Sequence, residues 1–329
     1  MMLGTLVMLL LFGSGTARSR DIDGGADRST SSRDAMLPFA VHVQACAKGD
    51  EFAEYRRQYG LNLQSPDGLW TVEQTVDRGL GLFAARNIDK GTHVLVEEPM
   101  FAINPGRFHA DKGYAIGALQ DAVEASFRRL NATSREEYLA CHEHRPTGSA
   151  GSRALHIFIS NAYTMPDGRV GIFPRIAKIN HSCRPNTVNT FSDSRGARVI
   201  WAGRDIAAGE EITVTYVPLI EATAGRRARL AQYGFKCQCE ACNAHEGDAE
   251  RLEMSNLARE LNGALSDPAS SGSVMTKARR LVRLVEDEGL VEYHAMAYRL
   301  ATLAAMRDGS NIVAERWARK EAEMHEYAR

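Results

Sequence analysis

The chain has almost no net charge and few cysteines, and both shortages limit what it can be. Lysine and arginine number 40 against 41 aspartate and glutamate, so the formal net charge is −1. No basic field indicates a nucleic-acid-binding protein, and direct nucleic-acid binding is not expected. Six cysteines in 329 residues make a disulfide framework a poor interpretation. Hydrophobic and charged contents of 44% and 25% are those of an ordinary globular protein.

Long apolar runs are scarce as well. The run Met1–Phe12 is too short for a membrane span, so no stable span is expected. Gly15-Thr16-Ala17 follows it and looks like a cleavage site, so residues 1–17 are a possible signal peptide or anchor. The run lacks the usual positive charge at its start, and a misplaced start codon is a third interpretation.

The rest of the chain weighs against secretion. Cysteines at short spacing fit a structural metal site, and reduced thiolates are most easily maintained in the cytosol or nucleus. Asn180-His181-Ser182 is formally a glycosylation sequon, and a glycan there would disrupt the motif described below. A nuclear or cytoplasmic location is therefore favoured. The secretory pathway, with oxidised thiols, stays open.

Hydrophobic periodicity divides the chain into blocks. Residues 18–66 predict a linker that is partly disordered, with one short helix near Asp50–Tyr59. Alternating patterns predict strands over 70–76, 81–85, 92–98, 170–173, 188–201 and 212–216. Helical spacing is found in 111–144, where Ser134 is the expected N-cap, and in 152–161 and 226–233. Beyond the cysteine-rich segment, helices are expected over 248–265, 273–287, 291–306 and 312–327. This distribution predicts an α+β protein.

Three separated segments carry the most information. They are Asn180-His181-Ser182-Cys183-Arg184-Pro185-Asn186, Gly209–Tyr216, and Cys237-Gln238-Cys239-Glu240-Ala241-Cys242, which Tyr233-Gly234-Phe235-Lys236 precedes. Together and in this order they resemble the SET-domain protein lysine methyltransferases. Gly79-Leu80-Gly81 matches the G-x-G turn of that family's first motif, and the resemblance covers roughly Trp70 to Asn243.

The same glycines allow a rival interpretation. Gly79, Gly81 and Ala84 also fit G-x-G-x-x-A, and Glu97 or Glu98 stands about where a ribose-binding acid would be. A dinucleotide-binding fingerprint needs a helix after the glycines. Gly91 stops any helix early, and a strand-rich stretch follows, so a nicotinamide enzyme is disfavoured.

The resemblance implies a cofactor and a reaction. SET enzymes transfer a methyl group from S-adenosylmethionine to a lysine amine, which must first lose its proton. The free amine has a pKa of about 10.4, and an apolar channel lowers it. By resemblance the cofactor would lie against Gly79, Leu80, Gly81, Asn161, Asn180, His181, Tyr216 and Phe235. Tyr216 is the implied catalytic residue, and Tyr163 and Tyr233 would wall the lysine channel.

The resemblance also implies a structural metal. Cys183, Cys237, Cys239 and Cys242 would form a closed four-thiolate zinc site. Such a site would hold the strap that carries Tyr233 and Phe235 over the active site.

The nearest branch of the family is the SET-and-MYND (SMYD-like) group, of fungal type. The helical insert, Asn161-Ala162-Tyr163 and the helical C-terminal extension carry this likeness. The MYND finger is not matched, because Cys141 is the one cysteine between Trp70 and Asn180. Leu80 departs from the polar residue that many members have between the two glycines.

The sequence thus predicts a SET-domain β-fold of small sheets with a knotted-type core, a helical insert, a zinc-binding post-SET strap and an all-α C-terminal region. The predicted divisions are residues 67–246 for the SET domain with its zinc site and 247–329 for the helical region. The predicted function is S-adenosylmethionine-dependent lysine N-methylation of a histone or non-histone protein. The alternative is a catalytically weak SET-fold binding or scaffold protein.

Overall fold

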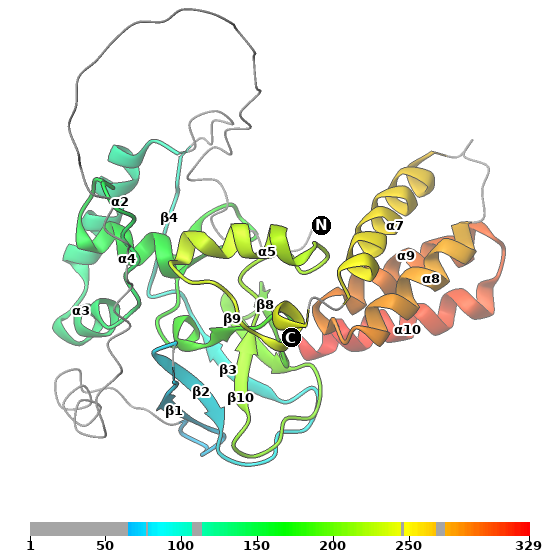
Figure 1. Cartoon of the computed structure of the whole chain (residues 1–329), viewed down its shortest axis with the longest axis horizontal. Coiled ribbons are helices and arrows are strands. Elements are labelled where there is room, and N and C mark those ends of the chain that lie inside the picture. Colours follow the sequence, from blue (N-terminus) through cyan, green and yellow to red (C-terminus); the bar gives the residue numbers. More distant parts are fainter. Residues whose placement is uncertain (1–64, 77, 107–113, 245–246, 268–273) are drawn as a thin grey trace, which may run out of the picture.

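The structure is a computed structural model, and it describes residues 65–76, 78–106, 114–244, 247–267 and 274–329 (Figure 1). The possible signal peptide, most of the predicted linker, its short helix and Cys46 lie outside these residues. Within the described ranges, no helix is both long enough and apolar enough to cross a membrane.

One small sheet brings distant motifs together. It contains β1 (Trp70–Gln74), β2 (Leu80–Ala84), β10 (Glu211–Val214) and β7 (Asn180–His181), in the order β1-β2-β10-β7. β10 runs antiparallel to β2 and parallel to β7, where Thr213 pairs with Asn180. The asparagine–histidine pair therefore lies beside the end of the strand that leads into Tyr216.

Two three-stranded sheets complete the β core. One has the order β3 (His93–Glu97), β9 (Ala197–Ala202), β8 (Thr187–Ser192). The other has the order β4 (Phe101–Ile103), β6 (Val170–Ile172), β5 (Ala162–Thr164). The segments 170–173 and 188–201 were expected as strands, whereas β4, β5 and β7 are too short to give an alternating pattern.

The insert between β4 and β5 is helical. It consists of α2 (Ile116–Arg129), α3 (Ala132–Leu139) and α4 (Arg153–Asn161). The prediction that Ser134 caps the second of these helices is wrong. Asn131 is the N-cap, and its Oδ1 accepts a hydrogen bond from the Ser134 N–H at 2.9 Å. Asn131 is the N-cap because it stands three residues before Ser134, where its side chain reaches a free amide of the first turn.

The C-terminal region is a bundle of helices beside the β core (Figure 1). α7 (Asp248–Ser266), α8 (Val274–Asp287), α9 (His294–Arg307) and α10 (Asn311–Tyr327) follow one another, with the short η3 (Val291–Tyr293) before α9. Their buried faces are rich in alanine and leucine, which permits close helix packing. The predicted fold class, small sheets with a helical C-terminal region, is confirmed.

A strap connects the β core to this bundle. It comprises α5 (Thr223–Leu230), η2 (Ala231–Tyr233) and α6 (Glu240–Asn243). The short η1 (Ile176–Lys178) is a separate element that contacts β2 in the core. Gly234 ends η2 in the left-handed conformation, with φ +83°. An added Cβ there would also lie 2.3 Å from the ring of His144, so glycine allows the strap to turn against the insert.

Candidate active site and cysteine cluster

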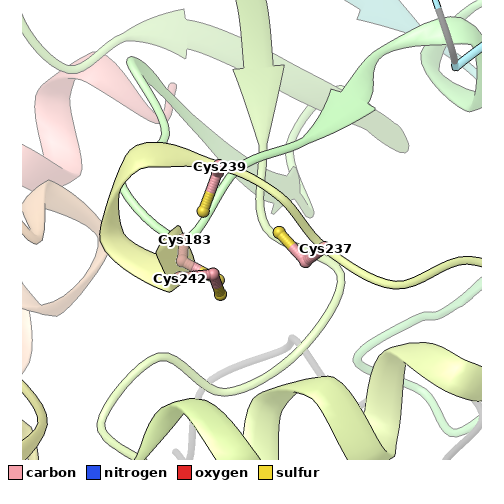
Figure 2. A group of neighbouring side chains, drawn as sticks. All are labelled: Cys183, Cys237, Cys239 and Cys242. Atoms are coloured by element: carbon pink, nitrogen blue, oxygen red, sulfur yellow. The ribbon is translucent and has the colours of Figure 1, made fainter. Parts of the chain in front are cut away.

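Four cysteines, three of them from the strap, lie close together (Figure 2). Cys183 follows β7, while Cys237, Cys239 and Cys242 come from the loop before α6 and from α6 itself. Their sulfur atoms all lie within 4.8 Å of one another, and all but the half-buried Cys239 are buried. Two thiolates bound tetrahedrally to one zinc ion, each about 2.3 Å from it, are about 3.8 Å apart. The cluster can therefore hold a tetrahedral zinc ion after small adjustments.

Hydrogen-bond donors surround the sulfur atoms. Arg226 is completely buried, and its Nε lies 3.3 Å from the Cys183 sulfur. Its Nη2 lies 3.9 Å from the Cys242 sulfur. Hydrogen bonds from Cys183 and Cys237 lower the pKa of the Cys239 thiol. The buried cation of Arg226 favours thiolates, which are the form that binds metal.

A polar cluster lies at the glycine turn. The Asn180 Nδ2 donates to the Leu80 carbonyl at 3.0 Å and to Glu211 Oε1 at 2.8 Å. Arg78 pairs with the other oxygen of Glu211 at 2.5 Å. A Cβ on Gly81 would lie 2.7 Å from Glu211 Oε1. Gly81 is thus required by the close approach of these side chains.

Gly79 differs from Gly81. It is exposed, has φ +69°, and an added Cβ would meet no atom within 4 Å. Glycine is favoured at position 79 because the backbone there is left-handed. The space beside it leaves the main chain of the turn accessible to a ligand.

His181 lies between the strap and Tyr216. Its ring centroid is 5.4 Å from that of Tyr216 and 6.4 Å from that of Phe235. The side chain is buried, and burial lowers the pKa of His181 to about 3. The imidazole is therefore neutral over the range in which proteins are normally studied.

Three tyrosines wall a narrow cavity. The cavity has a volume of about 20 Å³ and is lined by Ser160, Asn161, Ala162, Tyr163, Ala177, Tyr216 and Tyr233. The rings of Tyr216 and Tyr233 are 5.3 Å apart. Among the described residues, no group forms a hydrogen bond with the buried Tyr233 hydroxyl. The cavity therefore offers an unused polar atom between aromatic walls, which suits a slender chain with a polar tip.

The hydroxyl of Tyr216 is already fixed. It donates to the Ile179 carbonyl at 2.6 Å, so its lone pairs remain available on the cavity side. Burial raises the pKa of Tyr216 well above its usual value, and burial raises that of Tyr163 to about 12. Both remain neutral phenols at physiological pH.

Asn161 contributes to the wall of the cavity. Its Nδ2 donates to the carbonyls of His142 and Ile157, each at 2.6 Å. The amide hydrogens are thus used within the chain. A direct cofactor contact by this side chain, as the resemblance implies, would have to be made by its oxygen.

The structure brings most of the predicted site residues into one region. Asn180, His181, Tyr216, Phe235 and the cysteines are neighbours, and Tyr163 and Tyr233 line the cavity. The sequence interpretation missed Arg78 and Arg226, which touch these residues directly. An arginine in a polar run gives no sign that it is buried, so no periodicity would have selected Arg226.

Comparison with known proteins agrees with this geometry. The SET domain family model matches residues 79–217. Histone-lysine N-methyltransferase set5 of Schizosaccharomyces pombe is 29% identical over 189 residues, which are 56% of this chain and 53% of that protein. N-lysine methyltransferase SMYD2 of Gallus gallus is 32% identical over 197 residues, 56% of this chain and 43% of that protein.

A human relative is matched over a shorter region. Histone-lysine N-methyltransferase SMYD3 of Homo sapiens is 36% identical over 100 residues, 29% of this chain and 23% of that protein. The chain thus spans about half, or less, of the length of these relatives. The family model identifies a SET domain within this chain, and the matches to set5, SMYD2 and SMYD3 support a SMYD-like SET protein.

Proposed function

We propose that the protein is an S-adenosylmethionine-dependent protein-lysine N-methyltransferase. The observation that carries the proposal is the cavity walled by Tyr163, Tyr216 and Tyr233. Among the described residues the buried Tyr233 hydroxyl has no hydrogen-bond partner, and the Tyr216 ring contacts both Tyr233 and His181. The cavity has room for a small polar group, so it would receive the amine end of an unbranched lysine side chain. The aromatic faces would stabilise a methylated ammonium group. The relatives are named as lysine methyltransferases, which supports the same reaction.

The cofactor would be held on the other side of Tyr216. The residues that would contact it are those that the sequence resemblance implies: Gly79, Leu80, Gly81, Asn161, Asn180, His181, Tyr216 and Phe235. The fit rests on the open face of Gly79 and on the half-buried ring of Phe235 beside His181. When bound, S-adenosylmethionine supplies an electrophilic methyl group on its sulfonium.

The chain's own residues would supply desolvation and alignment. Buried walls disfavour the ammonium form of the lysine, which leaves a neutral amine as the nucleophile. Tyr216 presents lone pairs because its proton is engaged by Ile179, and it therefore accepts a hydrogen bond from the amine. The Tyr233 hydroxyl supplies a second polar contact. Holding the amine in line with its target accounts for the rate gain.

The zinc site has a structural part in this proposal. Cys183, Cys237, Cys239 and Cys242 would hold the ion, whose role is to fix the strap carrying Tyr233 and Phe235. A nuclear or cytoplasmic location belongs to the same proposal, because those compartments keep such thiols reduced. The substrate class is a protein lysine, of a histone or another protein.

Methyl transfer from labelled cofactor tests the proposal. The purified protein is incubated with radiolabelled S-adenosylmethionine and a panel of histones and cell-lysate proteins, and cofactor binding is measured by calorimetry. We expect labelled lysine in at least one acceptor. Cofactor binding without any labelled acceptor would favour the scaffold alternative. The absence of both cofactor binding and methyl transfer would reject the proposal.

A further inference from the structure

The His181 side chain connects Tyr216 to the cysteine cluster. Its Nδ1 lies 3.0 Å from the backbone nitrogen of Tyr216. Its Nε2 lies 3.3 Å from the sulfur of Cys183. The ring is 4% exposed, so solvent does not compete for either contact. One buried imidazole therefore touches both the cysteine cluster and the implied catalytic residue.

The directions of these two hydrogen bonds follow from chemistry. A backbone N–H can only donate, so Nδ1 must carry the lone pair that accepts from Tyr216. In a neutral imidazole the proton then resides on Nε2, which donates to the sulfur of Cys183. A thiolate is the form of sulfur that accepts such a bond best. The tautomer of His181 and a metal-binding state of Cys183 thus support each other.

Tyr216 depends on this bond because it lies just beyond β10. The strand ends at Val214, which pairs with His181, and the Val214 carbonyl accepts a hydrogen bond from the Ser182 N–H at 3.0 Å. Beyond that point the side chain of His181, not a neighbouring strand, accepts the N–H of Tyr216. The phenol is fixed separately through Ile179. Tyr216 is therefore held at two ends, and one end leads to Cys183.

Cys183 is itself held firmly. Arg226 donates to its sulfur at 3.3 Å, and the buried Arg251 donates from Nη2 to its carbonyl at 3.1 Å. Arg226 and His181 are the nitrogen donors to this sulfur among the described residues, and of these two His181 also forms a hydrogen bond with Tyr216.

We propose that His181 is a positioning residue that transmits the geometry of the cysteine–metal site to Tyr216. The inference rests on the proposed function for its catalytic consequence, whereas the hydrogen-bond relay itself can be tested without any turnover. It differs from the role that the sequence resemblance implies for this position, which is contact with the cofactor. A metal-bound thiolate would fix the histidine, and the histidine would fix the backbone of the tyrosine.

Two substitutions separate the halves of the relay. In His181→Asn, the amide oxygen stands near the place of Nδ1 and can still accept from Tyr216, while nothing reaches Cys183. In His181→Gln, the amide nitrogen stands near the place of Nε2 and can donate to Cys183, while the Tyr216 N–H loses its acceptor. We expect both variants to lose about 10–100-fold in kcat, the usual effect of removing an outer partner of a metal ligand. Zinc content and cofactor Kd should stay close to wild type.

Arg226→Lys is the matched control. It weakens a donor to the same sulfur but leaves the His181 branch complete, so zinc release to a chelator should accelerate with a smaller loss of kcat. Wild-type kcat in His181→Asn would overturn the relay, because satisfying the Tyr216 N–H would then suffice. A loss of kcat that tracks loss of zinc, or a cofactor Kd weakened in proportion, would overturn it too.

A spectroscopic measurement tests the relay even if the variants fold poorly or no acceptor is found. Nitrogen-15 NMR of histidine-labelled, zinc-loaded wild-type protein reports which ring nitrogen of His181 carries the proton. We expect the proton on Nε2. A proton on Nδ1 would overturn the proposal while leaving the proposed methyltransferase activity untouched, and absence of methyl transfer with the proton on Nε2 would count against the activity alone.

Discussion

The strap serves two buried sites that differ in how well their polar atoms are satisfied. At the cysteine cluster, Arg226 and His181 supply donors to sulfur, and the four thiols point at one another. At the tyrosine cavity, the Tyr233 hydroxyl is buried and forms no hydrogen bond with any described residue. A buried polar group that lacks a partner costs about 1–3 kcal/mol. We therefore expect the first site to contribute mainly to stability and the second to bind a ligand.

Breaking the cysteine cluster is expected to have the largest effect. Cys239→Ser, or exhaustive chelation of a zinc-loaded protein, should lower the free energy of unfolding by at least about 4–5 kcal/mol, since loss of a metal is among the most damaging changes. Methyl transfer should fall below detection because the strap loses its anchor. Calorimetric unfolding and metal analysis measure both effects.

Cys141→Ser is the control for that change. Cys141 is buried away from the cluster, burial raises the pKa of its thiol to about 11, and its sulfur donates to the Glu137 carbonyl. We expect a loss of only about 1 kcal/mol, a typical value for a single substitution, with unchanged metal content. Equal damage from the two substitutions would remove the distinction between the sites.

Tyr216→Phe should be the most damaging change at the cavity. It removes the oxygen that the Ile179 carbonyl fixes and that faces the cavity. We expect kcat to fall about 100-fold, the scale of a misaligned reactant, with cofactor affinity nearly retained. Single-turnover transfer and calorimetry separate the two quantities. A variant with wild-type kcat would mean that the phenol has no part in alignment.

Tyr233→Phe should change stability and activity in opposite directions. Removing an unsatisfied buried hydroxyl is expected to leave stability unchanged or to raise it by about 1 kcal/mol. Transfer should nevertheless fall about tenfold, the equivalent of one lost hydrogen bond of about 1.4 kcal/mol. Chemical denaturation and steady-state kinetics on the same preparation measure both.

Tyr138→Phe provides the reverse case. Tyr138 is also fully buried, but its hydroxyl donates to the Ala154 carbonyl at 2.7 Å. Its removal should lower the free energy of unfolding by about 1 kcal/mol, because a buried hydrogen bond is lost. If Tyr233→Phe were destabilising by the same amount, the interpretation of its hydroxyl as a ligand-binding atom would lose support.

The smallest expected effect is a pH dependence at the end of the strap. Burial raises the pKa of Asp248, but hydrogen bonds from Thr223 and the charge of Arg226 outweigh it, so the pKa lies below 3.8. A lowered folded-state pKa gives stability that is present above pH 3.8 and is lost as the pH falls through the folded value. Asp248→Asn should remove about 1 kcal/mol of stability at neutral pH and flatten that acid dependence.

The exposed pair of Glu253 and Arg280 is a matched control for Asp248. Glu253→Gln removes a similar hydrogen-bonded carboxylate from a solvated helix surface. Surface pairs contribute little, so the acid unfolding profile should not move. A shift as large as that of Asp248→Asn would indicate a general effect of net charge.

The sequence predicted the fold class because its strands and long helices have clear periodicities. The C-terminal helices were located to within two residues at nearly every end. The convergence of Cys183 with Cys237–Cys242 could be expected from motif order, and the structure has these residues together. The resemblance also named Tyr163 and Tyr233, which line the cavity.

What escaped prediction depends on contacts between distant segments. β7 is two residues long, and its pairing with β10 is set by the fold as a whole. Arg226 and Arg251 are completely buried, although arginine is usually a surface residue. Their burial depends on partners in distant segments, which the local sequence does not show. The direction of the His181 side chain likewise depends on the position of the Tyr216 amide, which no local pattern encodes.

The contacts of the helical bundle bear on how the protein can be divided. Arg251 donates to the carbonyl of Cys183, and Glu288 accepts from both Arg251 and Arg184. Tyr293 accepts from the backbone N–H of Leu219 at 2.8 Å. A truncation at the predicted boundary near residue 246 would remove Arg251, Glu288 and Tyr293. The SET domain expressed by itself would therefore leave the Cys183 carbonyl, Arg184 and the Leu219 N–H without these partners, beside the cysteine cluster.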